Sequence, residues 1–103
     1  MAIFVIGRVI EATKNDGTAL QTVTIGTETY KIGDPTDILY KVTANFGTGV
    51  KEYNDIVSMR QTLGTKRIAW ESGQHVLMVK TGSKGREVIF IADEEPIAFK
   101  TCN

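Results

Sequence analysis

Short apolar runs separated by turn-forming residues occupy the last third of the chain. The runs cover residues 67–70, 75–79, 88–92 and 97–102. The gaps between them hold glycine, serine, proline and acidic residues, which favour turns. Each gap is too short for a crossover helix, so we predict that neighbouring runs pair as antiparallel strands.

The first third of the chain repeats this pattern. Strands are predicted over about 2–11, 20–25 and 29–32. Asp16-Gly17, between the first two, favours a tight turn because glycine readily adopts a positive φ. Gly7, inside the first strand, marks a bulge or a bend. We therefore predict a three-stranded meander that ends at Gly33.

Helix signals appear only in the middle of the chain. Asp34 suits a helix cap, and Pro35 suits the first helical position. The segment also contains residues that favour strands, among them Tyr40 and Thr43. We predict a helix over 35–46, with a strand there as the alternative. The apolar positions near one helical face are Ile38, Leu39, Val42 and Phe46.

A second helix is predicted over about 54–63, between a capping Asn54 and a C-terminal stop at Gly64. The combined pattern predicts an α+β fold: a mainly antiparallel sheet or small, partly open barrel of about six strands, with one or two short helices near the middle. Residues 1–103 are expected to form a single compact domain, because a 42% hydrophobic content supplies one core without disulfides or metal.

The apolar runs do not indicate a targeting or membrane segment. The run at 2–6 lacks a basic region before it, and Gly7-Arg8 interrupts it. No run approaches the ~18 to 20 residues needed to span a bilayer. Cys102 has no second cysteine to pair with, which fits a reducing compartment. We expect a soluble cytoplasmic protein.

Candidate catalytic and metal-binding residues are few. His75 is the only histidine and Cys102 the only cysteine, which excludes two-histidine sites and cysteine–histidine zinc sites built from this chain alone. The hydroxyl nucleophiles Ser58, Ser72 and Ser83 lie in no recognisable nucleophile turn, and neither does Cys102. We therefore expect neither an enzyme nor a bound cofactor.

Two glycine-containing segments resemble fragments of phosphate-binding loops, because glycine exposes backbone amides and lysine adds charge. Neither has the full Walker spacing, and the second is interpreted as a hairpin turn. The segments are Gly47-Thr48-Gly49-Val50-Lys51 and Gly82-Ser83-Lys84-Gly85. The neighbouring carboxylates at Asp34 and Asp37 and at Glu94 and Glu95 are interpreted as cap and turn residues.

Charge is distributed unevenly along a chain whose formal net charge is zero. Residues 60–86 carry six basic side chains and one acidic one, Glu71, which gives a local net charge of +5. With Trp70 as a stacking ring, this segment suits a nucleic-acid-binding barrel, or an inhibitor or accessory factor that docks an acidic partner. The alternative is that the cations only solvate a hairpin. The basic residues are Arg60, Lys66, Arg67, Lys80, Lys84 and Arg86.

Two strands, at 2–6 and 88–92, are apolar on both faces. An antiparallel sheet with one face in water normally alternates apolar and polar residues, so these strands need cover on both sides. The cover is either the chain's own helices on one side with a closed sheet on the other, or another subunit. A helix over 54–63 covers only part of one face, which favours self-association through a second sheet face or an exposed edge strand. The candidate self-association residues are Phe4, Ile6, Ile89, Ile91 and Phe99.

The leading hypothesis is therefore a non-enzymatic structural or interaction protein that acts as a subunit of a homo-oligomer or larger assembly, with a virion as one setting. The nucleic-acid-binding barrel and the factor for an acidic partner are the alternatives. Neither a membrane nor a small-molecule substrate is inferred as a partner.

Overall fold

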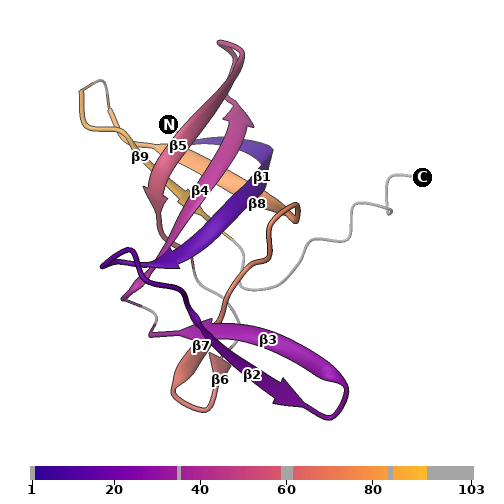
Figure 1. Ribbon diagram of the computed structural model, residues 1–103. Coiled ribbons are helices and arrows are strands. Elements are labelled where there is room, and N and C mark those ends of the chain that lie inside the picture. Colours follow the sequence, from indigo (N-terminus) through magenta and orange to yellow (C-terminus); the bar gives the residue numbers. More distant parts are fainter. Residues whose placement is uncertain (1, 35, 59–61, 84, 93–103) are drawn as a thin grey trace.

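In the residues that the structure describes, nine strands are arranged in two antiparallel sheets. The computed structural model describes residues 2–34, 36–58, 62–83 and 85–92. Sheet A has the strand order β5-β4-β1-β8-β9, and sheet B has the order β2-β3-β7-β6 (Figure 1). The strands are β1 (Ile3–Lys14), β2 (Gln21–Ile25), β3 (Glu28–Gly33), β4 (Ile38–Asn45), β5 (Val50–Ile56), β6 (Thr62–Leu63), β7 (Lys66–Ile68), β8 (His75–Thr81) and β9 (Val88–Ile91).

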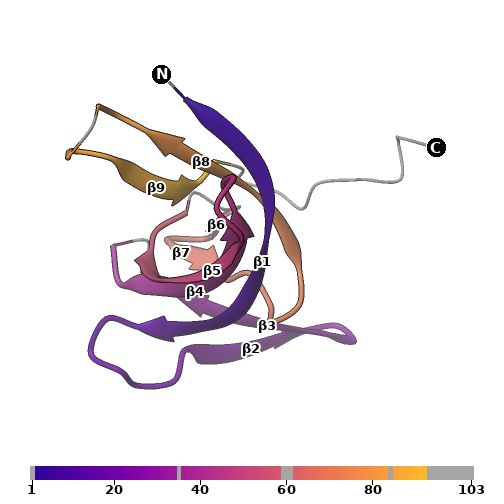
Figure 2. The ribbon, with the colours of Figure 1, turned by 90° about the horizontal axis from the view of Figure 1, so that it is seen from above.

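Sheet A is curved into a half-barrel around its central strand, β1. The first half of β1, Ile3 to Arg8, pairs with β8, and the second half, from Arg8 to Lys14, pairs with β4. This stagger forces the sheet to coil, and β1 sweeps around the molecule in Figure 2. The two edges of the sheet meet at one point, where the Ile91 amide donates to the Val57 carbonyl over 3.0 Å.

The core fills the concave side of sheet A. Alternate residues of β4 point into it, and Val42 at the centre is fully buried. Trp70 lies between β7 of sheet B and β8 of sheet A, and its side chain is 1% exposed. The Trp70 backbone amide donates to the Tyr40 hydroxyl over 3.1 Å, and its indole N–H donates to the Ser58 hydroxyl over 2.8 Å. Trp70, which follows β7 of sheet B along the chain, is therefore anchored in the core beneath sheet A.

The predicted α+β fold is wrong, because the residues described contain strands and turns but no helix. The strand alternative for 35–46 is the one observed, since β4 alternates buried and half-buried residues with a period of two. The expected helical face combined Ile38 and Val42, which point into the core, with Leu39, which lies on the opposite side of the strand.

Asp34, which was predicted to cap a helix, lies in a turn. A carboxylate oxygen of Asp34 accepts hydrogen bonds from the Thr36 amide, over 2.9 Å, and from the Thr36 hydroxyl, over 2.6 Å. These bonds from Thr36 hold the pKa of Asp34 below its ordinary value. An N-cap satisfies the same amide two residues on, so the local chemistry does not distinguish a helix start from an Asx turn before a strand.

The second predicted helix, over 54–63, is also absent where the structure describes this segment. Asn54 lies near the end of β5, whereas Thr62 and Leu63 form β6, and residues 59–61 lie outside the described part. Gly64 occupies the two-residue turn between β6 and β7, in which Leu63 pairs with Lys66. The glycine expected to stop a helix is therefore a hairpin residue.

The predicted strands are largely found, but their pairing is not. β2 and β3 form a hairpin as expected, yet β1 pairs with β4 and β8 instead of β2, so the three-stranded meander is wrong. Likewise β7 pairs with β3 and β6, and not with β8. The hairpin of β8 and β9 is confirmed, whereas the run at 97–102 lies outside the described residues. In the part described, no helix is long and apolar enough to cross a membrane.

Candidate functional site

A band of apolar side chains covers the convex side of sheet A, on β1, β8 and β9. Cross-strand pairing places Phe4 beside Val79 and Ile6 beside Leu77, and Val79 in turn lies beside Phe90. Their neighbours along each strand, such as Met78, point into the core, so these residues face outward. We call the six residues the outer apolar face: Phe4, Ile6, Leu77, Val79, Val88 and Phe90.

Three of the six residues of the outer apolar face are exposed to solvent. Phe4 is 59% exposed, Ile6 is 46% exposed and Val88 is 56% exposed. Val79, between two aromatic rings, is only 4% exposed. Scattered apolar residues are normal on a protein surface, but a contiguous band without charge is typical of an interaction site.

The expected self-association set agrees with this face only in part. Phe4 and Ile6 belong to it. Ile91 is 1% exposed and lies in the core, and Ile89 packs against the core beside it. Phe99 lies outside the described residues. Where every residue of a strand is apolar, the sequence does not show which alternate set faces inward, so Val88 and Phe90 were missed.

The basic residues of segment 60–86 do not gather at one place. Lys66 and Arg67 lie on β7 in sheet B, whereas Lys80 and Arg86 belong to the β8–β9 hairpin at the other end of the molecule (Figure 1). The Lys80 ammonium lies 3.6 Å from a carboxylate oxygen of Glu87 and 5.8 Å from the centre of the Phe46 ring. Arg60 and Lys84 lie outside the described residues. The local charge of the sequence is thus divided between two sheets.

Trp70, the expected stacking ring, is a core residue. Because it is 1% exposed and donates its indole N–H to Ser58, its faces are covered by protein. A base cannot stack on this ring without opening the core.

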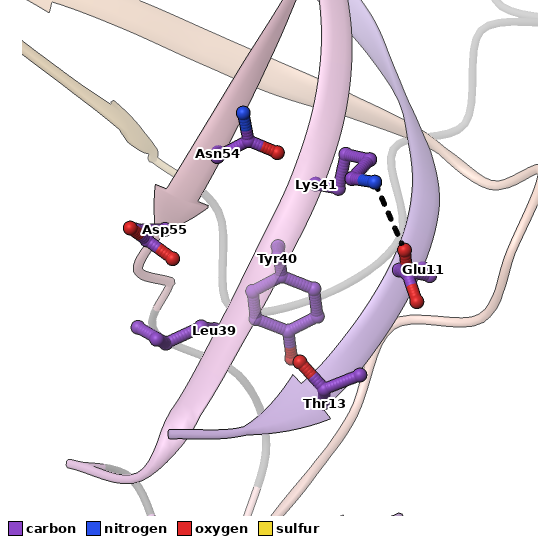
Figure 3. Close-up of a pocket in the computed structure, with 7 residues that line it drawn as sticks. All are labelled: Glu11, Thr13, Leu39, Tyr40, Lys41, Asn54 and Asp55. Atoms are coloured by element: carbon purple, nitrogen blue, oxygen red, sulfur yellow. Dashed lines mark ion pairs between the residues drawn. The ribbon is translucent and has the colours of Figure 1, made fainter. Parts of the chain in front are cut away.

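A shallow pocket lies where β4 is flanked by two bulges, and Figure 3 shows its lining residues. The extra residue Ile10 bulges from β1, and Asn54 and Asp55 of β5 together oppose Lys41. The Lys41 ammonium lies 3.2 Å from a carboxylate oxygen of Glu11. The pocket volume of about 110 Å³ is small compared with the roughly 300 to 1,000 Å³ of typical small-molecule sites. The lining residues are Glu11, Thr13, Leu39, Tyr40, Lys41, Asn54 and Asp55.

Asp55 in this pocket has a left-handed backbone, with φ of 57°. Because glycine adopts this conformation without a steric penalty, Asp55→Gly is expected to raise the free energy of unfolding by up to about 1 kcal/mol. Asp55→Ala is expected to lower it, since alanine lacks the polar side chain that lets aspartate tolerate this region. Urea unfolding of the three proteins tests the order. Equal destabilisation by both substitutions would show that the carboxylate itself stabilises the bulge.

The glycine loop at 47–51 does not offer its amides to a phosphate. The Asn45 side-chain carbonyl accepts the amides of Gly47, over 2.8 Å, and Gly49, over 3.1 Å, within the β4–β5 turn. Gly82, Ser83 and Gly85 of the second glycine segment lie between the paired strands β8 and β9, where the hairpin turn is expected, and the Ser83 carbonyl accepts the Arg86 amide over 2.8 Å. The described residues contain no group of three or more His, Cys, Asp or Glu arranged to hold a metal ion.

The candidate catalytic residues are not assembled either. The Ser58 hydroxyl accepts the indole N–H of Trp70 beside the core, whereas His75 is exposed on the convex side of β8, opposite Arg8 of β1. Ser72 and Ser83 lie in turns, and Cys102 is outside the described residues.

Comparison with protein-family models, with curated proteins and with solved structures finds no match. Three exposed apolar residues of the outer apolar face, Phe4, Ile6 and Val88, are the feature of the described residues from which a function is proposed below.

Proposed function

We propose that the protein is a non-enzymatic assembly subunit, which associates with further copies of itself through the outer apolar face. The observation that carries the proposal is the exposure of Phe4, Ile6 and Val88 on one convex sheet face, on which Arg8 and His75 lie at the end of the band next to Ile6. A second copy suits this face because the formal net charge of the chain is zero, so copies do not repel one another at long range. A repeating assembly of the virion type and a cytoplasmic location are part of the proposal.

An energy estimate bounds what the face contributes. Full burial of a large apolar side chain is worth about 1.5 to 3 kcal/mol, so a side chain that is already half buried adds about 1 kcal/mol. A two-fold contact that buries Phe4, Ile6 and Val88 of both copies therefore gains about 6 kcal/mol before the cost of association. A dissociation constant of about 1 μM needs a net gain of about 8 kcal/mol. The face alone gives a weak dimer, and a stable assembly requires a further contact.

The test is the solution mass, measured by light scattering and sedimentation as protein concentration rises. The wild-type mass is expected to rise above the 11.3 kDa of one chain, and Phe4→Glu is expected to weaken association at least tenfold, because it places a charge in the contact. Thr48→Glu adds the same charge in an exposed turn of sheet A and is the control. A mass of 11.3 kDa for the wild type up to millimolar concentration would overturn the proposal.

The alternatives based on segment 60–86 gain no support from the position of these residues, since its described cations lie on two sheets and Trp70 is buried. Titration with single- and double-stranded oligonucleotides at low salt tests the nucleic-acid alternative, because contacts to phosphates weaken steeply as salt rises.

A further inference from the structure

The β2 strand is an edge of sheet B that carries none of the usual protections. Residues 17–27, which include β2, contain no charged residue and no proline. Its outer side has no partner strand among the described residues. In natural proteins, lysine, proline, bulges or very short length normally prevent an edge strand from pairing with a strand of another chain.

The other sheet edges show these protections. β5 carries Lys51 and Glu52 and is bulged at Asn54 and Asp55. β6 is two residues long. β9 is partly covered, because its Ile91 amide is bonded to Val57 beyond it. Among the edge strands described, β2 alone is regular, uncharged and five residues long.

The hairpin register identifies which backbone groups β2 presents. Ile25 pairs with Glu28 across the two-residue turn Gly26-Thr27, and pairs that flank such a turn are hydrogen-bonded. Hydrogen-bonded pairs alternate with non-bonded ones, so Thr22 and Thr24 fall at non-bonded positions. The approach of the Thr24 and Thr29 hydroxyls to 3.4 Å is consistent with this assignment. The N–H and C=O groups of Thr22 and Thr24 therefore point away from β3.

We infer that β2 pairs antiparallel with β2 of a second copy, about a two-fold axis at Val23, so that the two copies of sheet B become one continuous sheet. In this register Thr22 lies opposite Thr24 of the second copy, and the two pairs exchange four backbone hydrogen bonds. Val23 lies opposite Val23 of the second copy, and Gln21 lies opposite Ile25 of the second copy. Every opposed pair is uncharged, and Thr–Thr and β-branched pairs stabilise adjacent strands. β5 is a poorer edge for such pairing, because its bulge at Asn54 and Asp55 interrupts the regular row of backbone groups.

The inference rests on the proposed function and extends it, because it supplies the second contact that the energy estimate requires. The outer apolar face lies on sheet A, whereas the β2 edge lies on sheet B, toward the other end of the molecule (Figure 1). A subunit with two different two-fold contacts alternates them with its neighbours, and so builds a ring or an open chain instead of stopping at a dimer.

The experiment compares Thr24→Pro with Thr24→Val. Proline removes an amide that points away from β3, so the hairpin is retained while the edge is blocked. Valine keeps the amide and the branched shape. Thr24→Lys, which leaves the backbone intact and adds a charge to the edge, serves if the proline variant does not fold. Circular dichroism and thermal unfolding confirm that each variant is folded.

The wild type and Thr24→Val are expected to form species larger than a dimer, whereas Thr24→Pro and Thr24→Lys stop at the dimer of the outer apolar face. Exchange of the Thr22 and Thr24 amides is expected to slow as wild-type concentration rises. Unchanged assembly in both the proline and lysine variants, or amide exchange independent of concentration, would overturn the β2 contact while leaving the proposed function in place. A wild type that stays at 11.3 kDa would overturn both.

Discussion

Replacement of Trp70 by alanine is expected to lower the free energy of unfolding by about 3 to 5 kcal/mol, the range found for truncation of large buried aromatic residues. Trp70 is 1% exposed and is the largest fully buried side chain, so its removal leaves a cavity in the core. It also leaves the Ser58 hydroxyl without the indole N–H that it accepts. A domain of this size is stable by only about 5 to 15 kcal/mol, so much of the total would be lost.

Urea unfolding at a fixed protein concentration measures this loss, because association would otherwise shift the apparent stability. Trp70→Phe is the matched control: it retains an aromatic ring and loses the hydrogen bond to Ser58. Ser58→Ala and the double variant then separate the hydrogen bond from the packing. A cost below about 1 kcal/mol for Trp70→Ala would contradict its role as a central residue of the core.

The second large effect is expected at Gly7, where alanine should lower the free energy of unfolding by about 2 to 3 kcal/mol through overpacking. A Cβ atom at this position would lie 2.5 Å from Cγ of Met78 and 2.8 Å from the Thr43 carbonyl oxygen. Met78 is fully buried and cannot turn toward solvent, and the carbonyl is held within the sheet. Glycine at this position is required by the close approach of its neighbours.

Thermal and urea unfolding test the prediction, with Met78→Ala as the background that relieves one of the two clashes. Gly7→Ala is expected to cost less in that background than in the wild type, and the difference measures the contact with Met78. Strict additivity of the two substitutions would show that the cost of alanine comes from the backbone alone.

The sequence predicts most strands because period-two alternation and turn residues are local properties. It does not predict the pairing of β1, whose partners begin about 30 and 70 residues further along the chain. Both halves of β1 are rich in apolar residues, so the pattern fits several partners equally well. The helix prediction failed because Asp34 satisfies the same amide in a turn as in a helix cap.

The candidate site could be predicted only in part for a related reason. Phe4 and Ile6 were expected because they lie in a strand that is apolar on both faces. Which residues of β9 face outward depends on its register with β8, which places Ile91 beside Met78 inside the core. The basic residues of segment 60–86 are close together in the sequence but not in space. The chain passes from sheet B to sheet A between β7 and β8, which separates Lys66 and Arg67 from Lys80. The stacking role considered for Trp70 in the nucleic-acid alternative required an exposed ring, and the sequence alone does not show that this ring is buried.

Because β1 pairs with both β4 and β8, its two halves gain their partner strands at different times during synthesis. Arg8 must wait for His75, its partner on β8, which lies 67 positions later (75 minus 8). At about 5 to 20 residues per second the ribosome needs roughly 3 to 13 seconds to supply that partner. Throughout this interval the apolar first half of β1 lacks its partner strand β8. The β2–β3 hairpin, by contrast, forms within microseconds of its emergence. The apolar first half of β1 is therefore exposed for seconds before its β8 partner is available, so we expect the yield of folded protein to depend on the capacity of the cell to shield new chains.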